Sequence, residues 1–226
     1  MARETSYGVC ELCGQRFSKA GMSRHITKCA PEHEPAGRRK VEWIHLHIEG
    51  DGAPMYWMNV EMRSQAKLSE LDQFLRDIWL ECCGHMSAFR IGETDFVMPF
   101  FDNGWSMREQ RSMNVTLEKA LQGVDRFTHE YDFGTTTYLK LRVVGRRQSS
   151  ASGDHIRLLA RNEPPDWRCG VCGQPATIIC TECMWGDTNP FLCDEHAEEH
   201  ECGEEMQLPV VNSPRMGMCG YDGGVW

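Results

Sequence analysis

Cysteine and histidine recur in closely spaced pairs along the C-terminal part of the chain. Two side chains separated by two residues can turn toward one metal ion, and thiolate with imidazole is a donor set that suits zinc. A structural zinc site takes four such donors in a tetrahedron. Two zinc ions are therefore predicted, and their ligands are Cys169, Cys172, Cys180, Cys183, Cys193, His196, His200 and Cys202.

The order of these pairs predicts how two ions share them. In a cross-braced module the first and third pairs bind one ion, and the second and fourth pairs bind the other. Cys219 lies further along and could replace His200 or Cys202. The spacing resembles that of a B-box or a related double-zinc finger over about residues 167 to 205. The two predicted sites are Cys169, Cys172, Cys193 and His196, then Cys180, Cys183, His200 and Cys202.

A second metal signature, C-x2-C-x11-H-x3-C, occupies residues 8 to 30. Its last two ligands are four residues apart, so both project from one face of a helix. Phe17 and Met22 fall between the pairs, where a ββα finger needs apolar cover. A third zinc ion is therefore expected, bound by Cys10, Cys13, His25 and Cys29.

The predicted helix of this finger is basic. Lys19, Arg24 and Lys28 are candidate contacts to a nucleic-acid phosphate backbone, although a solvated helix face explains them equally well. One finger buries little surface, so specific DNA recognition by it alone would be weak. The following residues, 31 to 40, are rich in Pro, Gly and charge and indicate a linker.

Twelve cysteines in 226 residues could also form a disulfide framework. The N-terminal sequence MARETSYGVC lacks the apolar core of a signal peptide, however. No run of about 18 apolar residues is present that could span a membrane. We therefore expect a cytoplasmic protein, in which clustered thiols stay reduced and bind metal.

The formal charge of −9 is unevenly distributed. Residues 1 to 40 carry eight basic and four acidic side chains, whereas residues 151 to 226 carry four basic and thirteen acidic ones. A negative surface repels phosphate, so the C-terminal module is a poor candidate for nucleic-acid binding. Any such contact is expected from residues 1 to 40.

Alternating apolar and polar side chains over residues 44 to 62, with a turn at 51 to 54, predict a β-hairpin. His45 and His47 share one strand face, but no third ligand lies near them in sequence. We interpret that face as half-exposed rather than metal-binding. Alternation over residues 127 to 143 around Gly134 predicts a second hairpin, followed by a loop at 146 to 154 and a strand at 156 to 160.

The longest predicted helix begins at the N-cap Ser69 and ends at Gly84, with an apolar stripe on one side. Adjacent Cys82 and Cys83 have poor geometry for one metal site, so Cys82 is assigned to the core and Cys83 to no role. Short strands are expected over residues 86 to 101 and a short helix over 116 to 121.

The first strand with its helix, the segment HMSAFRIG and the hairpin EYDFG occur in this order in the pRiA-type ORF-three-like family. The chain resembles that family over about residues 40 to 160. Members usually have an Asp and a Trp after the hairpin glycine, where this chain has Thr135, Thr136 and Thr137. The resemblance implies a compact α+β domain with a mixed sheet and carries little information about activity.

The expected fold class is α+β, with a central mixed sheet, one long and one short helix, and two flanking zinc modules. The predicted boundaries are 1–30 for the finger, 31–40 for the linker, 41–162 for the central domain and 163–226 for the double-zinc module. Complete ligand sets leave no position for a catalytic water. We therefore predict a non-enzymatic adaptor with a protein partner; the alternatives are nucleic-acid binding and an uncharacterised metal-dependent enzyme.

Overall fold

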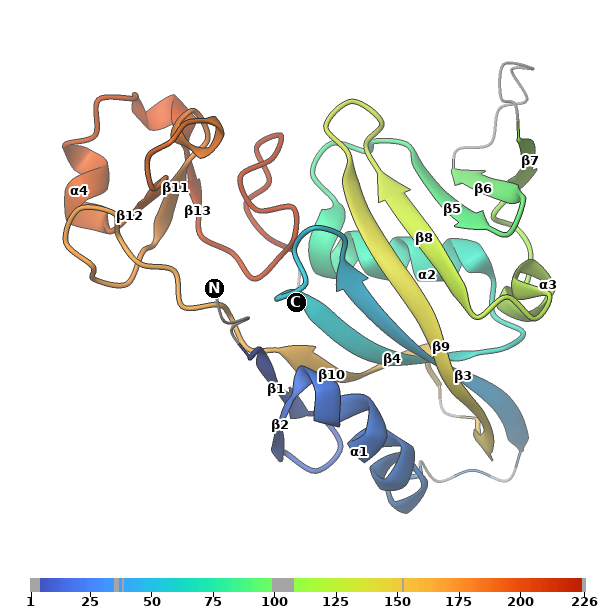
Figure 1. Cartoon of the computed structure of the whole chain (residues 1–226). Coiled ribbons are helices and arrows are strands. Elements are labelled where there is room, and N and C mark those ends of the chain that lie inside the picture. Colours follow the sequence, from blue (N-terminus) through green and yellow to red (C-terminus); the bar gives the residue numbers. More distant parts are fainter. Residues whose placement is uncertain (1–4, 35–36, 38, 99–107, 152, 225–226) are drawn as a thin grey trace. The chain divides into compact units, whose positions relative to one another are not determined.

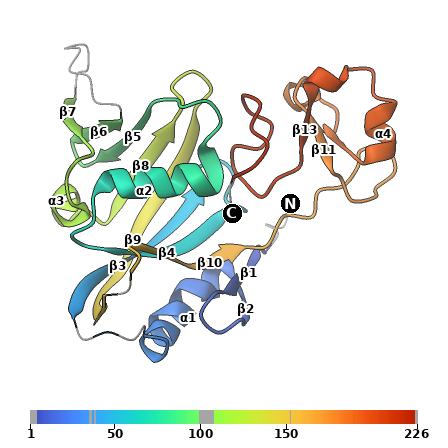
Figure 2. The same cartoon turned by 180° about the vertical axis from the view of Figure 1, so that it is seen from behind.

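The computed structural model describes residues 5–34, 37, 39–98, 108–151 and 153–224. The chain forms two compact units (Figures 1 and 2): residues 1–75 with 86–163, and residues 76–85 with 164–226. This division differs from the predicted boundaries. The N-terminal finger belongs to the same unit as the central domain, and the end of the long predicted helix belongs to the C-terminal unit.

Within the described residues, the first unit has ten strands in one sheet, in the order β2-β1-β10-β4-β3-β9-β8-β5-β6-β7. Neighbouring strands are antiparallel except β6 and β7, which are parallel. The predicted α+β class with a mixed sheet is confirmed. The strands are β1 (Tyr7–Cys10), β2 (Arg16–Ser18), β3 (Lys40–Gly50), β4 (Trp57–Arg63), β5 (Ser87–Ile91), β6 (Thr94–Met98), β7 (Glu109–Ser112), β8 (Arg126–Tyr131), β9 (Thr137–Ser150) and β10 (Ile156–Asn162).

Three α-helices lie in the described part of this unit: α1 (Lys19–Glu32), α2 (Leu68–Leu75) and α3 (Leu117–Leu121). Figure 2 shows α2 lying across one face of the sheet. Buried Asp72 of α2 has its Oδ1 2.7 Å from Nε2 of His129, which is fully buried on β8. This buried polar pair fixes α2 at one place on the sheet, because either partner alone would be costly to bury.

The long predicted helix is shorter than expected. After α2 the chain makes a π-helical turn, η1 (Arg76–Leu80), and then leaves the helix. Residues 82 to 84 are therefore not helical, so their side chains do not follow a helical stripe. Strand β6 is described as far as Met98, and residues 99 to 101 of the strands expected there lie outside the described residues.

The N-terminal hairpin extends the central sheet, because β1 pairs with β10. Gly8 faces the ring of Trp57 so closely that a Cβ there would come within 2.7 Å of it and would also collide with the Arg161 carbonyl. The Trp57 indole is fully buried, and its Nε1 donates to Ser6 Oγ at 2.8 Å. The finger and the sheet therefore share one core, which contains Cys10, Met22, Ile26, Cys29, Ala30, Trp57, Leu159 and Ala160.

The interpretation of the His45 and His47 face as half-exposed is wrong, since both side chains are buried. Asn59 of β4 lies between this face and α1: its Oδ1 is 2.9 Å from His45 Nε2 and accepts a hydrogen bond from Ser23 Oγ at 2.9 Å. Burial lowers the pKa of His47 to about 4, so this imidazole is neutral at pH 7. Ser23 belongs to α1, and local alternation along β3 could not indicate that this helix would lie near the His45 face.

The loop predicted at residues 146 to 154 is also partly wrong. Strand β9 continues to Ser150 and pairs with β3 from Lys40 onward. Arg147 on this extension donates to Oε1 of Glu61 through Nε at 2.6 Å, and Arg157 donates to Oε2 at 2.6 Å. Because the Glu61 carboxylate is buried, these ion pairs explain why polar residues here form strand rather than loop.

The second unit has a small sheet with the strand order β12-β11-β13 in its described residues. Its short elements are separated by turns, and small zinc modules commonly have this character because they lack a large apolar core. No helix within the described ranges is long and apolar enough to cross a lipid bilayer. After η1 the elements are β11 (Ile178–Cys180), η2 (Cys183–Trp185), β12 (Phe191–Leu192), α4 (Asp194–Glu198), η3 (Glu204–Met206) and β13 (Gln207–Pro209).

Replacing the buried carboxylate tests this account of the sheet. We expect Glu61→Gln to lower the free energy of unfolding by about 3 kcal/mol, because two arginines lose their charged partner in a largely buried position. Urea unfolding followed by tryptophan fluorescence measures the change. The matched control is Glu163→Gln, which removes an exposed pair with Arg16 and should cost less than about 1 kcal/mol. Equal losses in both variants would contradict the structural role of Glu61.

Candidate metal centres

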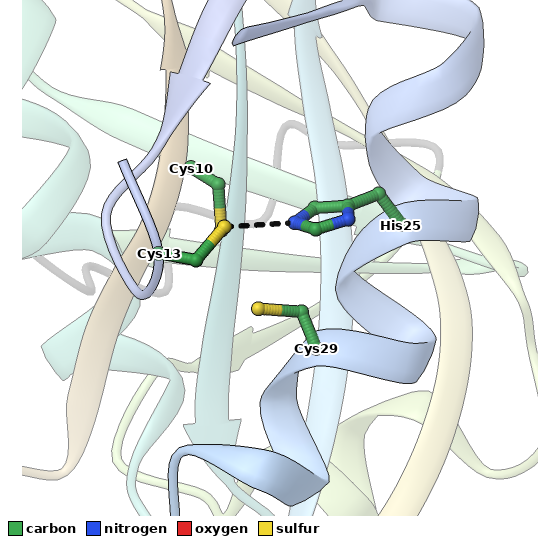
Figure 3. A group of neighbouring side chains, drawn as sticks. All are labelled: Cys10, Cys13, His25 and Cys29. Carbon is green, nitrogen blue, oxygen red and sulfur yellow. Dashed lines mark hydrogen bonds between the residues drawn. The ribbon is translucent and has the colours of Figure 1, made fainter. Parts of the chain in front are cut away.

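The N-terminal ligands come together between a hairpin and a helix (Figure 3). Cys10 and Cys13 lie at the turn between β1 and β2, and His25 and Cys29 project from α1 toward them. The four ligand atoms all lie within 4.8 Å of one another, and Cys13 Sγ is 3.3 Å from His25 Nε2. The structure therefore assembles the predicted ligand set in one place.

Neighbouring side chains position and shield this group. The ring of Phe17 stacks on His25 with centroids 4.0 Å apart, and Met22 is fully buried beside the ligands. Burial lowers the pKa of His25, which favours the neutral imidazole that binds metal. His33 Nδ1 lies 3.4 Å from Cys29 Sγ, where it can donate to a thiolate and orient it.

Two of the cysteine pairs, Cys10 with Cys13 and Cys169 with Cys172, lie on separate turns that have the same backbone hydrogen bonds. Gly14 N donates to Cys10 O at 2.8 Å and Cys10 N donates to Gln15 O at 3.0 Å. Gly14 has φ +72°, a conformation that glycine adopts without strain. In the second unit, the sequence C-x2-C-G-Q recurs with matching bonds, Gly173 N to Cys169 O at 2.9 Å and Cys169 N to Gln174 O at 2.8 Å.

The eight C-terminal ligands form two groups with the cross-braced sharing given above. Cys169, Cys172, Cys193 and His196 form one group, and Cys180, Cys183, His200 and Cys202 form the other, each within 4.8 Å. In the first group the Cys172 and Cys193 sulfurs are 3.8 Å apart. In the second, Cys183 Sγ is 3.9 Å from the Cys202 sulfur and 3.4 Å from His200 Nε2.

These separations fit zinc. Zn–S bonds of about 2.3 Å and Zn–N bonds of about 2.0 Å place tetrahedral ligands about 3.8 Å apart for two sulfurs and about 3.5 Å apart for sulfur and nitrogen. The observed sulfur pairs, at 3.8 and 3.9 Å, agree with the first value. Two sulfur–nitrogen pairs, at 3.3 and 3.4 Å, are close to the second value, and the pair Cys193 Sγ and His196 Nδ1 is shorter at 3.1 Å. Clusters of this composition could therefore bind zinc without large rearrangement.

The backbone prepares particular thiols for metal binding. Burial raises the pKa of Cys169, but the backbone N–H groups of Cys172, Cys193 and Val171 outweigh it and lower this pKa to about 6. Cys180 behaves alike: burial is outweighed, chiefly by the N–H of Cys183, and its pKa falls to about 7. Thiolate is the form that binds zinc, so each C-terminal group holds one thiol close to its binding state.

Cys219 does not join either predicted C-terminal group. It lies with Cys82, Cys83 and His85, whose ligand atoms and its own are within 4.8 Å of one another. From the sequence, Cys82 was assigned to the core and Cys83 to no role, because adjacent cysteines on the predicted helix have poor geometry for one metal site. The helix ends before them, however, so that geometric objection does not apply. The sequence feature that could have indicated this group is a Cys-Gly pair at each end of it, Cys83-Gly84 and Cys219-Gly220.

The candidate nucleic-acid contacts differ in availability. Lys19 Nζ donates to Pro54 O at 2.8 Å and also pairs with Glu49, so its charge is engaged within the fold. Arg24 and Lys28 are exposed on α1. The cationic surface of the finger is therefore smaller than the sequence indicated.

An open groove of about 450 Å³ lies on the first unit and was not anticipated from the sequence. Arg126, Lys140 and Arg142 contribute positive charge, and Lys140 Nζ pairs with Asp51 at 2.6 Å. Neutral His47 and acidic Glu49 also line it. The mixed lining offers a small cationic surface and does not specify a ligand.

Because the N-terminal ligands share a core with Trp57, loss of that zinc should loosen the sheet. We expect Cys13→Ser to bind one zinc ion fewer and to speed amide hydrogen exchange in β4 and β10. A structural zinc contributes on the order of 10 kcal/mol, so protection should fall strongly. In the control Cys172→Ser, which also removes one ligand, faster exchange should be confined to residues 164–226. Unchanged exchange in β4 and β10 after zinc loss would show that the finger folds independently.

The chain has detectable similarity to a solved structure and to a protein family. No curated protein matches the chain. A crystal structure of a protein of unknown function, MM3350 from Methanosarcina mazei Go1, matches at 12% identity, covering 54% of this chain and 69% of that chain with a TM-score of 0.45. The profile of the family described as plasmid pRiA4b ORF-3-like protein matches residues 42–180, extending further toward the C-terminus than the resemblance seen over 40 to 160. Since this match covers more than half of the chain, the chain belongs to the plasmid pRiA4b ORF-3-like family.

Proposed function

We propose that the protein is a cytoplasmic, non-enzymatic zinc-binding adaptor whose C-terminal double-zinc module binds a protein partner. The observation that carries this proposal is the pairing of closed Cys/His groups with exposed apolar side chains next to their ligands. Trp185 is 71% exposed and Val171 is 66% exposed. Large side chains this exposed are costly in water, and they commonly mark binding surfaces when something rigid presents them.

The ligand groups supply that rigidity. Val171 lies between Cys169 and Cys172 at the tip of a zinc turn, and Trp185 ends η2, which begins at the ligand Cys183. Zinc bound at these cysteines would fix the backbone on either side of each apolar residue. A rigid exposed tryptophan loses little conformational entropy on binding, so it is a favourable anchor for a partner.

The charge of the module supports a protein partner over a phosphate polymer. Residues 151–226 carry thirteen acidic and four basic side chains, and the acids include Asp194 and Glu195 in the first turn of α4. Each site with three thiolates and one zinc adds a further negative charge. A partner with a basic rim around an apolar pocket would complement this surface.

Two alternatives predict different behaviour. A metal-dependent enzyme would need a zinc position open to water, whereas each predicted group supplies four protein donors. Nucleic-acid binding has specific support in the exposure of Arg24 and Lys28 on α1. That alternative requires binding that weakens steeply with salt and with reversal of these two charges to Glu.

Affinity capture from the native cells distinguishes these functions. We expect tagged full-length protein to retain a protein partner after nuclease treatment, and Trp185→Ala to weaken this binding about 30-fold as a hot-spot tryptophan would. Chelation of zinc should release the same partner, because the presenting backbone then loosens. Affinity is measured with the recovered partner by calorimetry.

The matched control is Phe133→Ala, which removes another exposed aromatic side chain, 50% exposed, from the first unit. It should leave partner binding unchanged while zinc content stays constant in both variants. Loss of all partners on nuclease treatment would contradict the adaptor function and support nucleic-acid binding instead. If both substitutions weaken partner binding equally, the double-zinc module is not the docking surface.

A further inference from the structure

The group formed by Cys82, Cys83, His85 and Cys219 has the same composition as the three predicted sites, three cysteines and one histidine. It lies within the second unit, where the loop after η1 meets a turn near the C-terminus. Every one of the twelve cysteines of the chain then belongs to one of four Cys3His groups. This regularity would be hard to explain if Cys82, Cys83 and Cys219 were ordinary thiols.

The separations within this group suit a tetrahedral zinc site. Cys83 Sγ lies 4.0 Å from Cys219 Sγ, and His85 Nε2 lies 3.3 Å from Cys219 Sγ. The corresponding values expected around zinc are about 3.8 Å and about 3.5 Å. A disulfide needs its sulfurs about 2.05 Å apart. A bond between Cys83 and Cys219 would also not explain why Cys82 and His85 lie beside them, whereas a metal site uses all four side chains.

The backbone at these cysteines repeats the conformation of the predicted zinc turns. Gly84 follows Cys83 with φ +71°, and Gly220 follows Cys219 with φ +67°. The glycines after Cys13 and Cys172 have φ +72° and +73°. Cys219 itself has φ +48°, which is uncommon for a residue with a Cβ and occurs where surrounding interactions fix it. In these four Cys-Gly pairs the glycine thus adopts the left-handed conformation, and at Cys219 the cysteine does so as well.

A charged network holds the loop in place. Arg76 Nη1 donates to Glu81 Oε2 at 2.7 Å, and Arg76 Nη2 donates to the carbonyl of His85 at 2.7 Å. Glu81 Oε1 also accepts from Gly84 N at 2.5 Å. The turn that presents Cys83 and His85 is therefore ordered by contacts on its own side of the site, as a metal ligand shell requires.

A buried cation completes the electrostatics. Arg215 is fully buried, and its Nη2 donates to Cys82 Sγ at 3.3 Å. Three thiolates and one zinc ion carry a net charge of −1, which a guanidinium in contact can balance.

We propose that Cys82, Cys83, His85 and Cys219 bind a fourth zinc ion. This site connects the C-terminal segment to residues 76–85. Ser213 Oγ donates to Trp79 O at 2.7 Å, and a Cβ on Gly224 would come within 2.7 Å of Ile78 O, so the segment packs closely on η1. The fourth zinc links these two segments, which are far apart in sequence, and does not depend on the adaptor function.

Native mass spectrometry of the full-length protein, purified with a thiol reductant, tests the site by counting metal. We expect four zinc ions per chain for the wild type and three for both Cys219→Ser and Cys83→Ser. Because Cys83 and Cys219 are exposed, the fourth ion should also be the first released to a weak chelator, with both thiols then becoming reactive toward a maleimide. Peptide mapping locates the labelled positions.

The matched control is Cys172→Ser, which should also leave three ions but should keep Cys83 and Cys219 protected until chelator is added. A wild-type count of three, unchanged by Cys219→Ser, would overturn the proposal. A wild-type mass lower by two hydrogens, with Cys83 joined to Cys219 in mapped peptides, would overturn it as well. Neither result bears on Trp185, so failure of this site and failure of the adaptor function are separable.

Discussion

Soft donors crowded together need a cation, and this requirement governs the structure wherever cysteines gather. Each of the four groups holds three thiols and one imidazole with ligand atoms within 4.8 Å. Without a cation, ionisation of one thiol makes ionisation of the next less favourable. For example, the hydrogen bond with neighbouring Cys180 raises the pKa of Cys202 to about 12. A zinc ion reverses this opposition, because thiolates that repel one another are all attracted to it. Metal binding and local folding would therefore be one process at these positions.

The consequences of this requirement differ between the units. In the first unit, the N-terminal cysteines contribute to a core that includes Trp57 and Leu159, so a metal bound there and the sheet would stabilise each other. In the second unit, the described core around Cys180 is small, with buried Leu192 and Ala197. Few apolar side chains pack around Cys180, so folding of this part of the unit would depend more heavily on metal crosslinks. Zinc removal should accordingly loosen the first unit and unfold much of the second.

Local patterns predicted most of the ligand groups. A C-x2-C spacing fits one turn, and a His and a Cys four residues apart share a helix face, so the sequence alone indicated these partners. The order of the pairs then fixed which of them share an ion. The fourth group was not predicted, for two reasons. Its members Cys83 and Cys219 are far apart in the sequence, and a π-helical turn ends the helix before the adjacent cysteines.

The sheet shows the same division between local and distant information. Alternation located the hairpins and the burial of Ile44, Leu46 and Ile48, since side-chain direction along a strand is a local property. It gave no indication that Asn59 links His45 to Ser23 of α1, or that Glu61 binds arginines from two other strands. Both features depend on which elements become neighbours in space, and a single sequence carries that information only weakly.

Closed metal sites also constrain how the surface can act. A zinc with four protein ligands cannot polarise a substrate without losing one of them, so its contribution is to the shape and charge around it. In the second unit, the surface around the predicted metal sites combines acidic side chains with the exposed ring of Trp185. An acidic surface excludes phosphate polymers at long range, while an exposed indole favours close apolar contact. On the proposed function, these two properties would together favour a basic protein surface with a pocket, and a backbone fixed by zinc would present both without a prior ordering step.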